Sequence, residues 1–174
     1  GTAGVVRSFI ENKMYTRPSM PVKAWYYGPM FRYERPQAGR YREFYQFGVE
    51  VFGSTSPMVD AEVISIPVTL FRLLGLKGIQ VKINSLGDKE SRAAYREALL
   101  THFEPHLNEL CHDCQERYSK NPLRILDCKV DKELECMKNA PKLSDYLSEQ
   151  SKQHFESLKQ YLDDLGIDYI VDEH

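Results

Sequence analysis

The chain has 174 residues, of which 42% are hydrophobic, 11% aromatic and 28% charged, and its formal net charge is −2. This length fits one ordinary domain or two small ones, and the apolar content is enough to form a buried core. No apolar run approaches the roughly 20 residues that span a bilayer, and no signal-peptide pattern begins the chain. We therefore expect a cytoplasmic protein with no membrane partner.

Charge is divided unevenly along the chain. Residues 1–84 hold 11 Lys or Arg against 6 Asp or Glu, whereas residues 85–174 hold 12 against 19. This asymmetry suggests two bodies with different partners, and the basic one is the better candidate for phosphate chemistry. Because the chain begins at Gly1 without Met and ends in an apolar, strand-like run, we also expect a piece of a longer protein.

The first half contains the signals of a sheet flanked by helices. Hydrophobic spacing predicts a helix over residues 5–13 and two strands, 23–32 and 43–52, that form an antiparallel hairpin. Ser56 and Pro57 are typical of a helix start, and that helix should run to Leu74 and stop at Gly75. Residues 78–86 alternate between apolar and polar and predict a third strand.

The second half of the chain has a mostly helical pattern. Residues 88–110 and 145–165 have helical spacing, Gly166 ends the last helix, and residues 167–171 read as a return to a sheet. The predicted fold class is therefore α+β. We expect residues 1–84 to form a sheet-bearing body, residues 85–166 a mostly helical insertion, and residues 167–174 a return strand to the first body.

The strand at residues 43–52 has two different faces. Alternate residues of a strand point the same way, so one face carries Phe44, Gln46, Gly48 and Glu50, and the opposite face is apolar and should pack against a helix. The first face offers a ring, an amide, a gap without a side chain and a carboxylate. A small polar ligand could lie over Gly48.

The connection before this strand is rich in arginine, with Arg32, Arg35, Arg40 and Arg42 within eleven residues. Arginine is well suited to bidentate contact with carboxylate or phosphate. A planar base on Phe44 with phosphates among the arginines suits a nucleoside triphosphate. A solvated charged hairpin is the alternative, but the polar face, the gap and the arginines agree with one another and favour a binding surface.

This stretch resembles motif 2 of the class II aminoacyl-tRNA synthetases, and it is most similar to that of the histidyl-tRNA synthetase family. The residues that carry the resemblance are 1–4 (GTAG), 27–32 (YGPMFR), 34–37 (ERPQ), 39–40 (GR), Gln46, Glu50 and 121–127 (NPLRILD). The resemblance covers the whole chain. It implies part of an antiparallel class II catalytic sheet with flanking helices, plus a helical insertion domain.

The resemblance also implies a ligase with two-step chemistry. Histidine and ATP with Mg²⁺ would give histidyl-adenylate and pyrophosphate, and the histidyl group would then pass to tRNA(His). By position, Arg32 would be catalytic. The resemblance assigns ATP binding to Arg32, Glu34, Arg40 and Phe44, and histidine binding to Thr2, Arg32, Gln46 and Glu50, with Glu50 on the imidazole.

Other features of the family would lie outside these 174 residues. They are an upstream dimer motif, an Arg-Gly-Leu-Asp-Tyr-Tyr element, the third class motif and the anticodon-binding domain. We therefore expect a homodimer for the longer parent protein and little or no activation activity from this chain alone. One alternative function is the regulatory paralogue subunit of ATP phosphoribosyltransferase in histidine biosynthesis. A second is a helical zinc-binding interaction module centred on residues 85–166.

All four cysteines lie in the predicted insertion, and Cys111, Cys114, Cys128 and Cys136 have a spacing compatible with a tetrahedral Cys₄ zinc site. A single CxxC is a weak signal, and the family's function requires no metal here. Buried free thiols are the simpler interpretation, so we expect no bound metal. A basic strip of Arg117, Lys120 and Arg124 is either an RNA contact or a solvated helix face.

Overall fold

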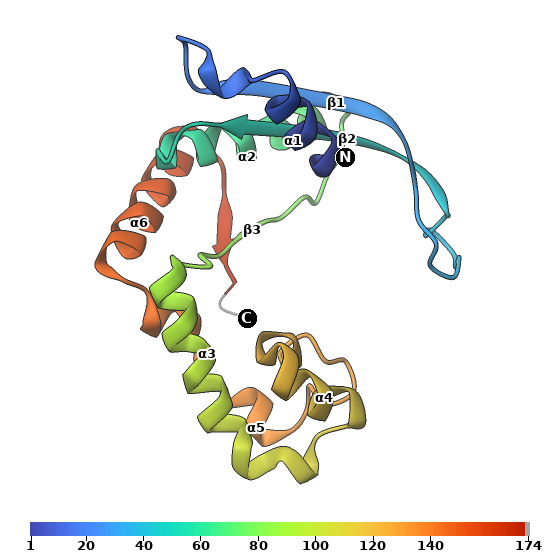
Figure 1. Ribbon diagram of the computed structural model, residues 1–174, viewed down its shortest axis with the longest axis vertical. Coiled ribbons are helices and arrows are strands. Elements are labelled where there is room, and N and C mark those ends of the chain that lie inside the picture. The colour runs from blue at the N-terminus through green and yellow to red at the C-terminus, as the bar shows by residue number, and fades with distance from the viewer. Residues whose placement is uncertain (173–174) are drawn as a thin grey trace. The chain divides into compact units, whose positions relative to one another are not determined.

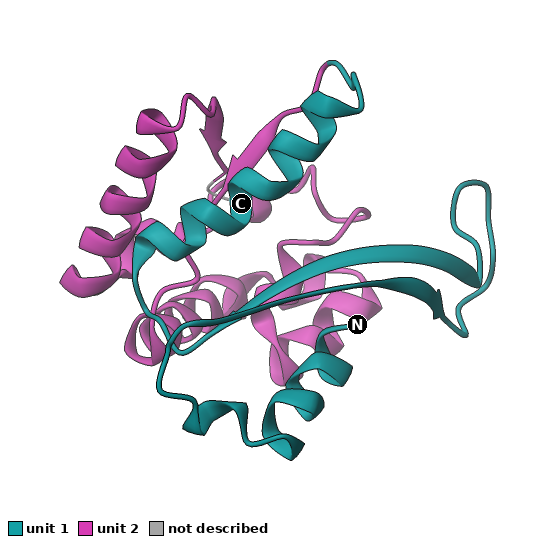
Figure 2. Ribbon diagram, turned by 90° about the horizontal axis from the view of Figure 1, so that it is seen from above, with its two compact units in different colours: residues 1–77 teal, residues 78–174 magenta. Residues whose placement is uncertain are grey.

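The computed structural model describes residues 1–172. The chain divides into two compact units, residues 1–77 and residues 78–174, which Figure 2 draws in teal and magenta. Helices and small sheets occur together, as the α+β prediction requires. Within residues 1–172 we find no helix whose length and apolar content would let it cross a membrane.

The first unit is built on one long hairpin. It comprises α1 (Thr2–Glu11), the 3₁₀-helix η1 (Met14–Thr16), β1 (Val22–Phe31), β2 (Glu43–Phe52) and α2 (Pro57–Leu73). The two strands pair antiparallel in one unbroken register, from Val22 opposite Phe52 to Phe31 opposite Glu43. The connection over residues 32–42 therefore extends beyond the paired strands (Figure 1).

Local signals account for the ends of these elements. The Ser56 side chain accepts a hydrogen bond from the Met58 N–H at 3.3 Å, and Pro57 is the first residue of α2, as predicted. Gly75 follows the helix with φ +71°, a left-handed conformation that glycine adopts without strain. α1 begins three residues earlier than hydrophobic spacing predicted, because the small residues of its first turn carry no apolar pattern.

Helices cover the hairpin only in part. The rings of Phe9 in α1 and Phe52 in β2 stack with centroids 4.4 Å apart. α2 contributes Val63 and Ile66 to a hollow that side chains of β2, among them Val49, also line. The apolar face that was expected to pack against a helix therefore meets α2 at one end. Towards the connection it stays open in this unit, where Tyr45 is 64% exposed.

The second unit holds a separate two-stranded sheet and the helices. β3 (Val81–Ile83) pairs in parallel with β4 (Tyr169–Val171). Between them the chain forms α3 (Lys89–Phe103), η2 (Glu104–Glu109), α4 (His112–Lys120), η3 (Pro122–Ile125), α5 (Glu135–Lys138), η4 (Leu143–Tyr146) and α6 (Glu149–Asp164). Leu99, Phe103 and Ile125, all fully buried, form the centre of its hydrophobic core.

The third strand is shorter than predicted. Only residues 81–83 of the expected 78–86 form a strand, because β4 offers three partner residues. β3 and β4 both belong to the second unit. The predicted division at residue 84, with a return of residues 167–174 to the first body, stays a prediction for the longer protein. Residues 173–174 of that predicted segment lie outside the described residues.

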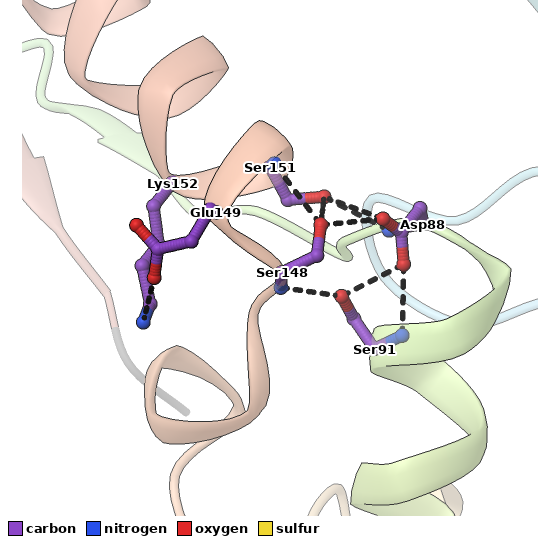
Figure 3. Close-up of polar contacts among 6 residues, drawn as sticks. All are labelled: Asp88, Ser91, Ser148, Glu149, Ser151 and Lys152. Atoms are coloured by element: carbon purple, nitrogen blue, oxygen red, sulfur yellow. Dashed lines mark hydrogen bonds and ion pairs between the residues drawn. The ribbon is translucent and has the colours of Figure 1, made fainter.

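Asp88 links the beginnings of two helices in this unit (Figure 3). Its carboxylate accepts hydrogen bonds from the Ser91 N–H and hydroxyl, both at 2.8 Å, and so caps α3. The same carboxylate accepts from the hydroxyls of Ser148, the residue that caps α6, and Ser151. One charged group thereby satisfies donors at both helix N-termini.

Candidate active site

The residues assigned to ligand binding share one face of the hairpin in the first unit. Residues that are directly opposite in an antiparallel pair share a face of the sheet, and the register sets Met30 opposite Phe44 and Ala24 opposite Glu50. Phe44, Gln46 and Glu50 consequently lie on one side, as the alternation predicted. All three side chains are half-buried, so they are accessible to a ligand.

Tyr26 occupies the space over Gly48, which was expected to be open. The register sets Tyr26 directly opposite Gly48, and a Cβ built on Gly48 would overlap the tyrosine ring. The prediction of a free gap at this glycine is therefore wrong. The glycine is needed for the close approach of an aromatic side chain from the neighbouring strand.

Tyr26 also connects the other predicted histidine-binding residues. The Gln46 amide nitrogen donates a hydrogen bond to the Tyr26 hydroxyl at 3.1 Å. A Cβ built on Gly1 would overlap the same ring, so the beginning of α1 lies against it, and Thr2 is the first residue of that helix. Sequence reasoning missed Tyr26, because the predicted strand ends, residues 32 and 43, would have paired it with Val49 instead of Gly48.

Arg32 reaches the same face from the far end of β1. Its guanidinium carbon lies 4.1 Å from the centroid of the Phe44 ring. The Arg32 Nε donates to the Tyr41 carbonyl at 2.7 Å, and its backbone N–H donates to the Arg42 carbonyl at 2.9 Å. The connection therefore holds Arg32 over the ring that was assigned to a planar base.

Glu34 and Arg40, the other two residues assigned to ATP, pair with each other. The Arg40 guanidinium and the Glu34 carboxylate are 3.2 Å apart in an exposed ion pair. Arg42 adds a hydrogen bond from its Nε to the Glu34 carbonyl at 3.4 Å. Exposed ion pairs of this kind contribute about 0–1 kcal/mol, so a ligand can replace this one at little cost.

A comparison with known proteins identifies the family. The family model described as histidyl-tRNA synthetase matches residues 1–172. This chain belongs to the histidyl-tRNA synthetase family. The resemblance read from the hairpin motif is confirmed, and so is the α+β class expected of a histidyl-tRNA synthetase catalytic region.

The chain is 59% identical over 172 residues to a histidine–tRNA ligase of Anoxybacillus flavithermus, a match that covers 99% of the chain and 41% of that relative. It is 56% identical over 172 residues to the histidine–tRNA ligase of Bacillus subtilis, again covering 99% of the chain and 41% of the relative. The crystal structure of apo Staphylococcus aureus histidyl-tRNA synthetase matches with a TM-score of 0.79 at 47% identity. That match covers 100% of this chain and 40% of the other. The chain thus spans about two fifths of the length of these histidyl-tRNA synthetases.

The cysteines of this chain are divided between two groups. Cys111, Cys114 and Cys128 lie together with Asp131, whereas Cys136 lies with His106 and Glu109. The four-cysteine set suggested by the spacing is therefore not assembled in the described part of the chain. Asp131, which sequence reasoning missed, takes the place expected for Cys136.

The basic strip is flanked by acidic side chains. Arg117, Lys120 and Arg124 line one hollow, together with Asp113, Glu116 and Asn121. Lys120 pairs with Glu116 at 2.9 Å and, through its hydrogen bond and charge, lowers the pKa of that carboxyl. Two carboxylates within the hollow weaken its attraction for a phosphate backbone. Contact of this strip with RNA stays a prediction.

Proposed function

We propose that this chain forms part of a histidine–tRNA ligase and that the hairpin face of the first unit holds ATP and histidine. The observation that carries the proposal is the presence of Arg32, Phe44, Gln46 and Glu50 on one accessible face, in a chain of this family. These residues supply a cation, a flat ring, an amide and a carboxylate. ATP and histidine need this set of groups.

In the first proposed step, a carboxylate oxygen of histidine attacks the α-phosphorus of ATP. The bond between this phosphorus and the oxygen that bridges the α- and β-phosphates breaks, and pyrophosphate leaves. Arg32 donates hydrogen bonds to an α-phosphate oxygen and to the histidine carboxylate, so it brings two anions together and stabilises the charge that develops. In the second step, a ribose hydroxyl at the end of tRNA(His) loses its proton and attacks the acyl carbon, the bond from that carbon to the phosphate oxygen breaks, and AMP leaves.

Adenine that stacks on the face of the Phe44 ring covered by Arg32 would displace the guanidinium. An exposed cation–π contact is worth about 0.5–1 kcal/mol. Hydrogen bonds to a charged group are worth about 1.5–3 kcal/mol. Hydrogen bonds to the phosphate therefore outweigh the ring contact alone, while the Nε hydrogen bond to the Tyr41 carbonyl must be kept or replaced. The same movement frees this face of the ring for adenine. Glu34 and Arg40 would likewise exchange their ion pair for contacts to ATP.

The other end of the face suits histidine. Because the Gln46 amide nitrogen is engaged by the Tyr26 hydroxyl, its carbonyl oxygen is left to accept from the α-ammonium group. Thr2, at the beginning of α1, would add a contact to the backbone end of the substrate. Glu50 would accept an imidazole N–H, which apolar isosteres of histidine cannot provide.

Magnesium fits this face only as a part of the ATP substrate. Over residues 1–172, the groups of three or more metal-binding side chains lie in the second unit, and none is on the hairpin. Mg²⁺ is commonly held by substrate phosphates with one or two carboxylates, and Glu34 could be one of these. The ion would neutralise phosphate charge. Cytoplasmic location, tRNA(His) and a homodimer are parts of the same proposal and follow from the family resemblance.

The proposal is tested by histidine-dependent exchange of pyrophosphate into ATP, in a protein of the relatives' length that contains this chain. Arg32→Gln should reduce exchange by roughly 100-fold or more, the effect of removing one donor to a developing oxyanion. Arg17→Gln, a change to an exposed arginine outside the hairpin and its connection, is the matched control. The chain of residues 1–174 alone should give little exchange.

Two results would contradict the proposal. One is wild-type exchange by the Arg32→Gln variant. The other is a long protein that binds histidine without exchange, which would favour the regulatory paralogue instead. Near full-length exchange rates from residues 1–174 alone would overturn only the expectation that this chain is inactive by itself.

A further inference from the structure

Four side chains of the second unit converge in a way that the proposed ligase chemistry does not use. Cys111, Cys114, Cys128 and Asp131 each offer one potential ligand atom, and these atoms all lie within 4.8 Å of one another. Cys111 precedes the first residue of α4, Cys114 lies in the first turn of α4, and the other two follow η3. The chain returns from η3 to complete a set that a single CxxC could not form.

The spacing of the sulfur atoms fits a tetrahedral ion. With Zn–S bonds of about 2.3 Å, two thiolates at tetrahedral angles are separated by about 3.8 Å. The Sγ atoms of Cys111 and Cys128 are 3.8 Å apart. A carboxylate oxygen can complete the set, since Asp and Glu bind zinc at about 2.0–2.2 Å.

The backbone holds Asp131 in place. Its two carboxylate oxygens accept from the Cys111 N–H at 3.2 and 3.1 Å. The Asp131 N–H in turn donates to the Cys128 sulfur at 3.5 Å, a contact that favours a thiolate. The two loops that supply the ligands are therefore already fixed against each other.

Burial of the carboxylate is the unusual feature of this arrangement, because free cysteines are often buried. Asp131 is only 4% exposed, and Cys114 and Cys128 are 0% and 6% exposed. A buried carboxylate is normally paired with a cation or bound to a metal. Within residues 1–172, no lysine or arginine forms an ion pair with Asp131. A set of four protein ligands leaves no open position for a substrate, which is typical of a structural metal site.

The segments around this cluster are short, so a cross-link between them would add stability. From residue 104 to 147 the chain consists of short segments, of which the nine-residue α4 is the longest, with 3₁₀-helices and turns between them. Small bodies with little regular structure are commonly held together by a metal or disulfides. An ion held by α4 and the segment after η3 would tie these two pieces together.

We propose that Cys111, Cys114, Cys128 and Asp131 bind one Zn²⁺ ion that stabilises the helical insertion. On binding, the three thiol protons pass to solvent and four bonds form, three from sulfur and one from a carboxylate oxygen. The soft thiolates and tetrahedral geometry select zinc over Mg²⁺ or Ca²⁺, which prefer oxygen ligands. The inference is independent of the proposed ligase function. It replaces the four-cysteine candidate with a set that excludes Cys136.

The test uses the complete chain, purified with a phosphine reductant, stripped of metal and titrated with Co²⁺ and then Zn²⁺. We expect the intense visible absorption of tetrahedral thiolate-bound Co²⁺, saturation at one equivalent, and its loss when zinc displaces cobalt. Elemental analysis after gel filtration should find one zinc per chain. Zinc should also raise the melting temperature of the stripped protein.

Variants identify the ligands. Cys128→Ser and Asp131→Asn should lose stoichiometric zinc, whereas Cys136→Ser should retain it. Cys136 is the matched control because it is buried, 3% exposed, in the same hydrophobic core. If a ligand variant fails to fold, the cobalt spectrum and zinc stoichiometry of the wild-type chain still decide the proposal.

Three results would overturn it. One is a reduced wild-type chain that binds no cobalt or zinc. Another is loss of zinc in Cys136→Ser with retention in Cys128→Ser, which would assign the ion to the group of His106, Glu109 and Cys136 instead. The third is a Cys111–Cys128 disulfide in the protein as isolated, with no zinc uptake after reduction, which would make the cluster a redox pair.

Discussion

The guanidinium of Arg32 rests on the ring of Phe44, 4.1 Å from its centroid, at the end of the hairpin next to the connection. The residue assigned to the α-phosphate thus covers the residue assigned to adenine. Both assignments hold together if nucleotide binding moves Arg32 off this side of the ring, or if adenine stacks on the other side. Arg32 and Phe44 should therefore act as a pair in ATP binding.

Replacing Phe44 with leucine should weaken ATP binding roughly tenfold, because stacking of a base on an aromatic ring is worth about 1–3 kcal/mol. Titration calorimetry on the longer protein measures the change. Tyr45→Leu is the matched control, since Tyr45 is the next residue along the strand and lies on the opposite face. Equal weakening by both variants would show that this face does not hold the base.

Replacing Glu50 with glutamine should weaken histidine binding by roughly tenfold to 100-fold and leave ATP binding unchanged. A hydrogen bond to a charged group contributes about 1.5–3 kcal/mol, and the neutral amide can instead present an N–H to the imidazole. Competition binding with histidine and ATP separates the two effects. If Glu50→Gln weakened ATP as much as histidine, the imidazole assignment would be wrong.

Gly48→Ala should lower the melting temperature, because its Cβ would overlap the Tyr26 ring and displace it from Gln46. Gly28→Ala should be neutral or slightly stabilising. Gly28 faces Gln46 in the same sheet, but a Cβ there meets no atom within 4 Å. Comparing the two variants separates the effect of the Tyr26 contact on stability from the general stabilisation gained by replacing a glycine in a strand.

A second measurement tests whether the stability lost in Gly48→Ala is due to Tyr26. In a Tyr26→Ala background, Gly48→Ala should lower the free energy of unfolding much less, because the clashing ring is gone. A double-mutant cycle from thermal or urea unfolding gives this interaction. Additive effects of the two changes would refute the proposed contact.

Asp88→Asn should lower the melting temperature at pH 7. Hydrogen bonds from the Ser148 hydroxyl and from the Ser91 N–H and hydroxyl hold the pKa of Asp88 well below its usual value of 3.8. The pKa is lower in the folded chain, so the ionised group stabilises the fold above the unfolded-state pKa. That stabilisation is lost as the pH falls through about 4 towards the folded-state pKa.

Thermal melts at several pH values test the direction of this pH dependence. The difference in melting temperature between wild type and Asp88→Asn should be largest at pH 7 and should shrink below about pH 4. Asp113→Asn, which changes an exposed acid in the first turn of α4, is the control for the loss of one charge. A difference that grew on acidification would contradict the role of the ionised carboxylate.

The sequence by itself determined the features that depend on near neighbours. Side chains alternate along any strand, so Phe44, Gln46 and Glu50 share a face whatever the rest of the chain does. Ser56, Pro57 and Gly75 similarly fixed the ends of α2, because caps and left-handed residues act within one helical turn. The hairpin motif was long enough to identify the family.

Only the tertiary structure decided which distant residues meet. Tyr26 covers Gly48 because the length of the connection sets the register between strands, and side chains opposite each other then compete for the same space. Asp131 joins Cys111, Cys114 and Cys128, while Cys136 does not, because the path of the chain after η3 brings one residue back to α4 and carries the other past it. Residue spacing limits which groups can meet, and the folded path of the chain selects among them.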